Sequence, residues 1–161
     1  RDRAKQLSWL LPSAEREAHR VAAGLAEAFN GRADEDCFLH ADFYNKQVLA
    51  GPGGASLIDL DRARSGAAGE DLGCFLAHRE KARLAEMAGA GGDGSVEALC
   101  AGYESAGGRI DDRALARWTG LALFRLSHQP FRDRAVDWPH LTREMLACCT
   151  EWLRRAEAQR G

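Results

Sequence analysis

A single β-like segment, residues 37–63, constrains this 161-residue chain more than any other part of it. The segment reads CFLHADFYNKQVLAGPGGASLIDLDRA, and its two short apolar runs each lead directly into acidic residues. The letters GPGG at residues 51–54 separate residues 47–50 from residues 56–58, which predicts a β-hairpin. Two antiparallel strands of about four residues span only about 13 Å, so the hairpin brings both acidic ends to one edge. The segment therefore predicts a charged site at a very small sheet.

The rest of the chain has the apolar periodicity of helices. Helices are expected over residues 13–29, 69–89, 95–108, 111–129 and 137–159. Expected N-caps are Ser13, Asp111 and Asp137, Pro139 fits a first helical turn, and Asn30 with the following glycine ends the first helix. So few strands do not support a doubly wound parallel sheet. We expect a mostly helical α+β fold.

Length, charge and cysteine content indicate which kinds of partner and which cellular compartment to expect for this chain. The length suits one domain, and the formal net charge of −2 gives no reason to expect nucleic acid or a membrane surface as partner. No apolar run approaches the ~20 residues of a membrane span, and no signal-peptide pattern opens the chain. The five cysteines include no CxxC pair, which is typical of thiols in a reducing compartment. We therefore expect a cytoplasmic protein.

The acidic residues at the predicted hairpin form an oxygen-rich set. Asp42 begins a loop, Gln47 closes it, and the hairpin returns the chain to Asp59. Two carboxylates and an amide oxygen are hard ligands, which suit Mg²⁺ together with the phosphates of a substrate. The pattern predicts a magnesium and phosphate site.

Three motifs in order resemble the aminoglycoside phosphotransferase and choline kinase-like family, small-molecule relatives of protein kinases. They are HADFYNKQVL, LIDLDRA and EDLGCFLAH, and the match is close over residues 38–78. The family carries an HxDxxxxN catalytic loop, a strand that ends in an acidic metal motif, and a D-[LI]-[AG] helix start. The resemblance implies that residues 1–161 are the C-terminal lobe of a protein kinase-like fold.

The same resemblance implies a second lobe. Family members clamp the nucleotide with an N-terminal β-rich lobe, and most nucleotide-binding residues are expected there. The present chain opens without methionine, in helix-like sequence, so we expect that lobe to belong to the same protein outside this chain.

The family pattern also implies roles for the residues of the predicted site. Asp42 would be the catalytic residue that orients the acceptor hydroxyl, and Asp59 would hold Mg²⁺ against the nucleotide phosphates. Gln47 stands where the family has a metal-binding asparagine. Glutamine keeps the amide oxygen but adds a methylene, so metal binding by Gln47 requires a slightly different backbone position.

Other acidic and basic residues near the motifs have supporting roles in this reading. His40 is expected to fix the catalytic loop by hydrogen bonding, and Asp71 to brace the loop backbone from a helix start. Asp61 is either a second metal contact or the partner of Arg62 or Arg64 in a salt bridge.

The function implied is a small-molecule kinase that transfers the γ-phosphate of ATP or GTP to a hydroxyl group. Two alternatives stay open: a non-catalytic, pseudokinase-like binding module, favoured by Gln47, and a DxD-type phosphatase. The phosphatase class needs Thr or Val where this chain has Ala63, and a parallel sheet. A cationic acceptor would need acidity from residues such as Glu70, Glu80, Glu104 and Asp111, although a solvated helical face explains them equally well.

Overall fold

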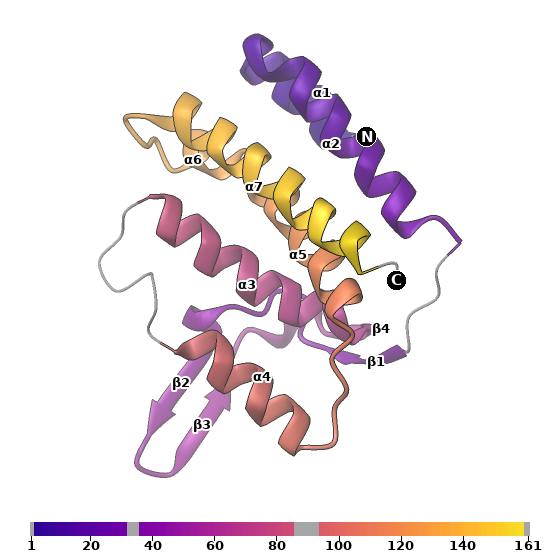
Figure 1. Ribbon diagram of the computed structural model, residues 1–161. Helices are drawn as coiled ribbons and strands as arrows, with labels where there is room; N and C mark the ends of the chain where they lie inside the picture. Colours follow the sequence, from indigo (N-terminus) through magenta and orange to yellow (C-terminus); the bar gives the residue numbers. More distant parts are fainter. Residues whose placement is uncertain (1, 32–35, 86–93, 160–161) are drawn as a thin grey trace.

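The structure is a computed structural model that describes residues 2–31, 36–85 and 94–159. Seven helices and four short strands occur in these ranges (Figure 1). The helices are α1 (Asp2–Leu10), α2 (Glu15–Phe29), α3 (Ala68–Leu84), α4 (Ser95–Ser105), α5 (Asp112–Leu126), α6 (Gln129–Arg132) and α7 (Trp138–Ala158). The strands are β1 (Asp36–Leu39), β2 (Val48–Gly51), β3 (Gly54–Leu57) and β4 (Arg64–Ala67). The fold is α+β and mostly helical, as the sequence predicted.

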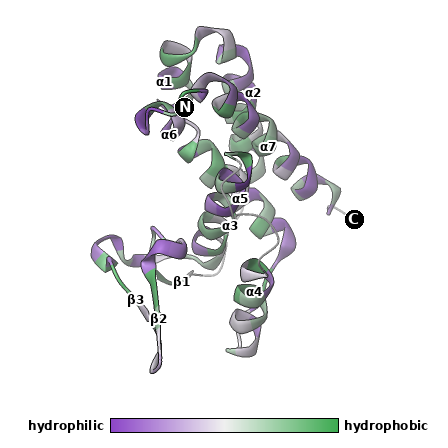
Figure 2. Ribbon diagram, turned by 90° about the vertical axis from the view of Figure 1, so that its left-hand side faces the viewer, coloured by the Kyte–Doolittle hydropathy of each residue, from purple (hydrophilic) through white to green (hydrophobic). Residues whose placement is uncertain are grey.

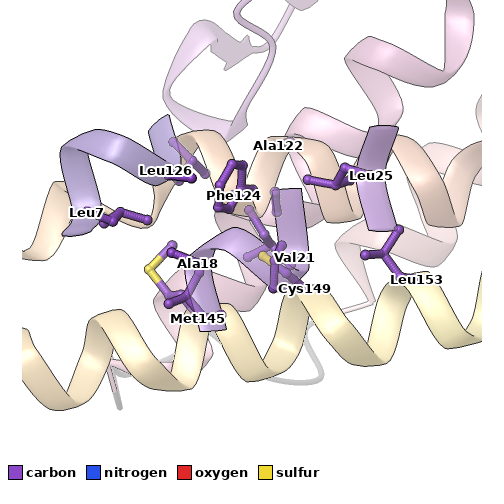
Figure 3. Close-up of a cluster of buried hydrophobic side chains, with 14 of the residues drawn as sticks. Leu7, Ala18, Val21, Leu25, Ala122, Phe124, Leu126, Met145, Cys149 and Leu153 are labelled. Carbon is purple, nitrogen blue, oxygen red and sulfur yellow. The ribbon is translucent and has the colours of Figure 1, made fainter. Parts of the chain in front are cut away.

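Helix α5 lies at the centre of the helical body, packed against α3 on one side and α7 on the other (Figure 1). Helices α1 and α2 pair with each other, and α2 also packs on α5 and α7. The side chains that fill the space between these helices are apolar (Figure 3). They include Leu7, Val21, Leu123, Met145 and Leu146, each at most 2% exposed. Truncating a side chain of this kind to alanine typically costs about 2–5 kcal/mol.

The helix ends agree with the sequence at some positions and not at others. Asp111 caps α5 through hydrogen bonds from the backbone of Arg113 and Ala114. Asp137 occupies the predicted position immediately before α7, but its side chain makes no capping hydrogen bond. Ser13 lies inside a short 3₁₀ turn ahead of α2, so the prediction that it caps this helix is wrong. The predicted helix over residues 111–129 divides into α5 and α6, with Pro130 in the first turn of α6. The predicted helix over residues 69–89 ends at Leu84, and its last four expected residues lie outside the described ranges.

The strands form two separate antiparallel pairs rather than one hairpin sheet. Strands β2 and β3 pair from Val48 with Leu57 to Gly51 with Gly54, which confirms the predicted hairpin. Strand β1 pairs with β4, and Leu39 lies opposite Arg64. The residues between β1 and β2, including Asp42, therefore connect the two sheets. The β2–β3 hairpin projects away from the helical body (Figure 2).

Helix α3 approaches α5 closely at its first turns. A Cβ atom on Gly73 would lie 2.7 Å from the backbone nitrogen of Thr119 and 2.7 Å from the backbone carbon of Trp118. Glycine is therefore required at this crossing, because the groups it faces are main chain and cannot rotate away. This close contact fixes where α3 crosses α5. It therefore also fixes the position of Asp71, which lies two residues before Gly73. Among the described residues, no helix combines the length and apolarity that crossing a membrane would require.

Candidate functional site

The loop after β1 begins with a residue in an unfavourable conformation. Ala41 has φ 63°, in the left-handed region of backbone conformation that residues other than glycine rarely adopt. The backbone N–H of His40 donates to Asp71 Oδ2 at 2.7 Å, and that of Ala41 donates to Asp71 Oδ1 at 2.9 Å. One carboxylate thus satisfies two consecutive amide groups. These bonds offset the cost of the left-handed residue, about 1–2 kcal/mol.

Asp71 comes from the first turn of α3, thirty residues further along the chain than Ala41. Burial raises the pKa of its carboxyl group above the usual value, although the two amide bonds and the nearby His40 act in the opposite direction. The predicted contact between Asp71 and this loop is present. Its contribution to catalysis stays a prediction.

His40 connects the loop to the end of strand β3. The imidazole is 4% exposed, and its Nε2 lies 2.8 Å from the carbonyl oxygen of Ile58. Because a carbonyl oxygen can only accept, Nε2 carries the proton of this hydrogen bond. In the described part of the chain Nδ1 is buried without a partner. The geometry is that of a structural histidine, the role expected for it.

Asp42 is the next residue, and it faces the segment that follows β3. Its side chain is 38% exposed, and Oδ2 lies 3.9 Å from the guanidinium of Arg62. Arg62 belongs to a 3₁₀ turn, Leu60–Arg62, for which Asp59 is the preceding residue. Asp42 therefore lies beside the segment that carries Asp59, held there by His40 on one side and approached by Arg62 on the other.

Asp59 and Gln47 contact each other directly. Gln47 Nε2 donates to Asp59 Oδ2 at 3.1 Å, and the backbone N–H of Ile58 donates to the carbonyl oxygen of Gln47. Gln47 is 6% exposed, whereas Asp59 lies at the surface. Asp59 is also left-handed, with φ 62°. The structure thus brings together the two residues that the sequence predicted on the metal side.

Asp61 is exposed, and neither neighbouring arginine pairs with it in the described ranges. Arg62 approaches Asp42, and Arg64 pairs with Glu70 at 2.6 Å. The salt-bridge alternative for Asp61 is therefore not realised here, and the metal contact stays a prediction.

The Asp59 carboxylate fits a hard cation, and metal binding by the side-chain oxygen of Gln47 stays a prediction. Carboxylate and amide oxygens suit Mg²⁺, which typically takes one or two protein carboxylates and completes its shell with phosphates and water. No group of three or more His, Cys, Asp or Glu side chains within the described residues is arranged to hold a metal. A cation at Asp59 would accordingly have few protein ligands, the usual situation for Mg²⁺ bound with a nucleotide.

Two aromatic pairs next to the Asp42 loop were not predicted from the sequence. The ring of Tyr44 stacks on that of His78 with centroids 4.2 Å apart, and Phe43 stacks on Phe75 at 5.5 Å. Burial, together with the positive charge of Lys81, lowers the pKa of His78 to about 4, so the ring is neutral at physiological pH. The sequence held one signal that could have predicted the position of His78. It follows Asp71 by seven residues, so the two residues lie on the same face of α3.

The acidic side chains considered for a cationic acceptor are mostly engaged within the protein. Glu70 is 9% exposed and accepts from both Arg64 and Arg125, at 2.6 and 3.0 Å. Glu80 pairs with Arg83, and Asp111 caps α5, as described above. Their carboxylates are occupied by these contacts, which favours a structural role over acceptor binding.

Comparison with known families places this geometry in context. Residues 1–111 match the family model described as "Phosphotransferase enzyme family". Comparisons with curated proteins and with solved structures give no significant match. The family match contains the Asp42 loop, the Asp59 segment and the start of α3, and it extends over well more than half of the chain. The chain therefore belongs to the phosphotransferase enzyme family.

Proposed function

We propose that this protein is a small-molecule kinase that transfers the γ-phosphate of ATP or GTP to a hydroxyl group of its acceptor. The observation that carries the proposal is the adjacency of the Asp42 loop and the Asp59 segment. The His40 side chain, in the Asp42 loop, hydrogen-bonds to the carbonyl oxygen of Ile58, immediately before Asp59. Arg62, three residues after Asp59, approaches the Asp42 carboxylate. Phosphoryl transfer needs an acceptor-orienting carboxylate and a metal-side carboxylate in neighbouring positions.

In this proposal Asp42 accepts the hydrogen bond of the acceptor hydroxyl and directs its oxygen toward the γ-phosphorus. A new bond forms between that oxygen and phosphorus, the bond between the γ-phosphorus and the bridging oxygen breaks, and the nucleoside diphosphate leaves. The hydroxyl proton passes to Asp42 as the bond forms. Mg²⁺ held at Asp59 would supply neutralisation of the phosphate charge.

The surroundings of Asp42 hold its carboxylate in place for this task. Asp71 fixes the backbone immediately before it, and buried His40 prevents the loop from moving away from β3. Because phosphoryl transfer depends mainly on positioning and electrostatics, the Asp42 carboxylate needs such support to orient the acceptor hydroxyl. The nucleotide-clamping N-terminal lobe implied by the family pattern is part of the same proposal, and so is the C-terminal lobe assignment of this chain.

The binding-module alternative makes a different prediction from the kinase. A pseudokinase-like protein would bind a nucleotide without transferring phosphate, whereas a kinase does both. The DxD-type phosphatase has no support from the fold, since the strands in the described ranges pair only antiparallel.

The test uses the full-length protein with Mg-ATP or Mg-GTP and a panel of small alcohols, with phosphate transfer followed by ³¹P NMR. Asp42→Ala is expected to lower transfer by at least about 10²-fold, while the nucleotide dissociation constant from calorimetry stays nearly unchanged. Asp59→Ala is expected to weaken both transfer and metal-dependent nucleotide binding. Transfer by Asp42→Ala at the wild-type rate contradicts the proposal, and nucleotide binding without transfer to any acceptor supports the binding module.

A further inference from the structure

The contact between Gln47 and Asp59 fixes which end of the glutamine amide faces the carboxylate. The side-chain oxygen of Gln47 would repel an Asp59 oxygen at 3.1 Å, whereas the NH₂ group donates to it. The side-chain nitrogen of Gln47 therefore donates its hydrogen bond to Asp59 Oδ2. Among the residues that the structure describes, the other carboxylate oxygen, Oδ1, has no hydrogen-bond partner and can contact a ligand.

The backbone of Gln47 holds the same segment as its side chain does. Its carbonyl oxygen accepts the N–H of Ile58 at 3.1 Å, and its own N–H donates to the carbonyl oxygen of Tyr44 at 2.9 Å. Gln47 is therefore a buried residue anchored on both sides, and it contacts two consecutive residues at the end of β3. Little freedom remains for it to move toward another ligand.

Asp59 needs such an anchor. Its φ of 62° and ψ of 52° are left-handed, and its side chain lies at the protein surface. An exposed carboxylate normally samples several rotamers, and fixing one of them costs conformational entropy. A hydrogen bond from a buried amide removes that freedom before any ligand arrives.

We propose that Gln47 is a positioning residue, which orients the Asp59 carboxylate by hydrogen bonding and leaves Oδ1 as the oxygen that meets the cation. The family pattern has asparagine at this position as a metal ligand. The additional methylene of glutamine here extends the amide to the Asp59 carboxylate. The inference rests on the proposed function only in taking Asp59 as the metal-side carboxylate.

A double-mutant cycle without metal tests the orienting contact. Gln47→Met removes the amide at nearly constant length, and Asp59→Gly removes the carboxylate while tolerating the left-handed backbone. Unfolding by urea in EDTA is measured for the full-length wild type, both single variants and the double variant. We expect the two sites to be coupled by about tenfold in the unfolding equilibrium constant. Asp59→Asn is the matched control, because its amide oxygen still accepts from Gln47 and preserves most of the coupling.

Titration with Mn²⁺, followed by electron paramagnetic resonance, separates orientation from direct metal binding. Gln47→Met is expected to weaken Mn²⁺ binding by about 10-fold to 100-fold, since Asp59 remains but is no longer held in one orientation. Asp59→Gly is expected to abolish it. Equal loss of Mn²⁺ binding in both variants, or a cycle without coupling in EDTA, overturns the inference.

These outcomes are distinct from a failure of the proposed function. If Asp42→Ala transferred phosphate as well as the wild type, the kinase assignment would fall, but the metal-free coupling between Gln47 and Asp59 would be unaffected. Conversely, absence of that coupling would leave phosphate transfer by the wild type intact.

Discussion

Asp71 holds Ala41 in a left-handed conformation through a 2.9 Å hydrogen bond from the Ala41 amide, across thirty residues of sequence. The second carboxylate oxygen accepts the amide of His40. A helix start and a strained loop thereby form one unit, and Asp42 extends from that unit. The stability of the loop and the placement of the Asp42 carboxylate depend on the same two hydrogen bonds.

Replacing Asp71 is therefore expected to destabilise the protein. Asp71→Ala leaves two part-buried N–H groups without an acceptor, at a cost of about 1–3 kcal/mol in the free energy of unfolding measured with urea. Asn at this position retains one acceptor and should lose less. Ala41→Gly removes the conformational strain and should recover part of the loss. Asp112→Ala is the control, since Asp112 is an exposed acid in the first turn of α5. A similar loss in that control would show that Asp71 acts only through the helix dipole.

The crossing of α3 and α5 gives a second prediction. In Gly73→Ala the new methyl group meets the main chain of Trp118 and Thr119 at 2.7 Å, so the helices must separate. We expect a loss of about 1–3 kcal/mol in thermal or urea unfolding. Gly102→Ala in α4 is the matched control, because nothing lies within 4 Å of its added Cβ, and it should be neutral or stabilising by up to about 1 kcal/mol. Equal stability of the two variants would contradict the close crossing.

Much of this site could be predicted from the sequence because its signals are local. The turn letters at residues 51–54 set the β2–β3 hairpin, and the position of Asp111 ahead of an apolar periodic run set a helix cap. The order of the His40, Asp59 and Asp71 motifs identified three segments that the structure brings together. Resemblance to a family supplied the roles that local patterns do not contain.

The features that were missed depend on residues far apart in the chain. Strand β4 is a short polar segment, and only its pairing with β1 makes it a strand. Glu70 meets Arg125 across 55 positions, which no spacing rule predicts. The orientation of the Gln47 amide likewise depends on where the hairpin places Asp59. Such contacts follow from the packing of whole elements, so they require the structure.

His78 gives the protein a predictable response to acid. Its pKa falls from the usual 6.5 to about 4 in the folded protein, so the unfolded chain binds more protons between these values. The stabilising effect of neutral His78 is present above pH 6.5 and is lost as the pH falls from 6.5 to 4, by up to ~3 kcal/mol. His78→Gln should flatten the pH dependence of the unfolding free energy in this window. His128 also has a lowered pKa, but it is present in both the wild type and the His78→Gln variant. The difference between their two pH profiles therefore reports on His78. Identical pH profiles would show that the ring titrates normally.

Glu70 provides the last prediction, because its single carboxylate joins three elements. It accepts from Arg64 of β4 and from Arg125 of α5, while its own backbone belongs to α3. Removing one member of a fully buried ion pair costs about 3–5 kcal/mol, but both arginine side chains here are about half exposed and can recover hydration from water. We therefore expect Glu70→Gln to cost only about 1–2 kcal/mol in urea unfolding, with the loss reduced in 1 M NaCl. Glu80→Gln breaks a local pair with Arg83 on one helix and should cost about 0.5 kcal/mol or less. If the two variants lost the same stability, the Glu70 contacts would be no more than surface pairs, and the start of α3 would be held by the Gly73 crossing and Asp71 alone.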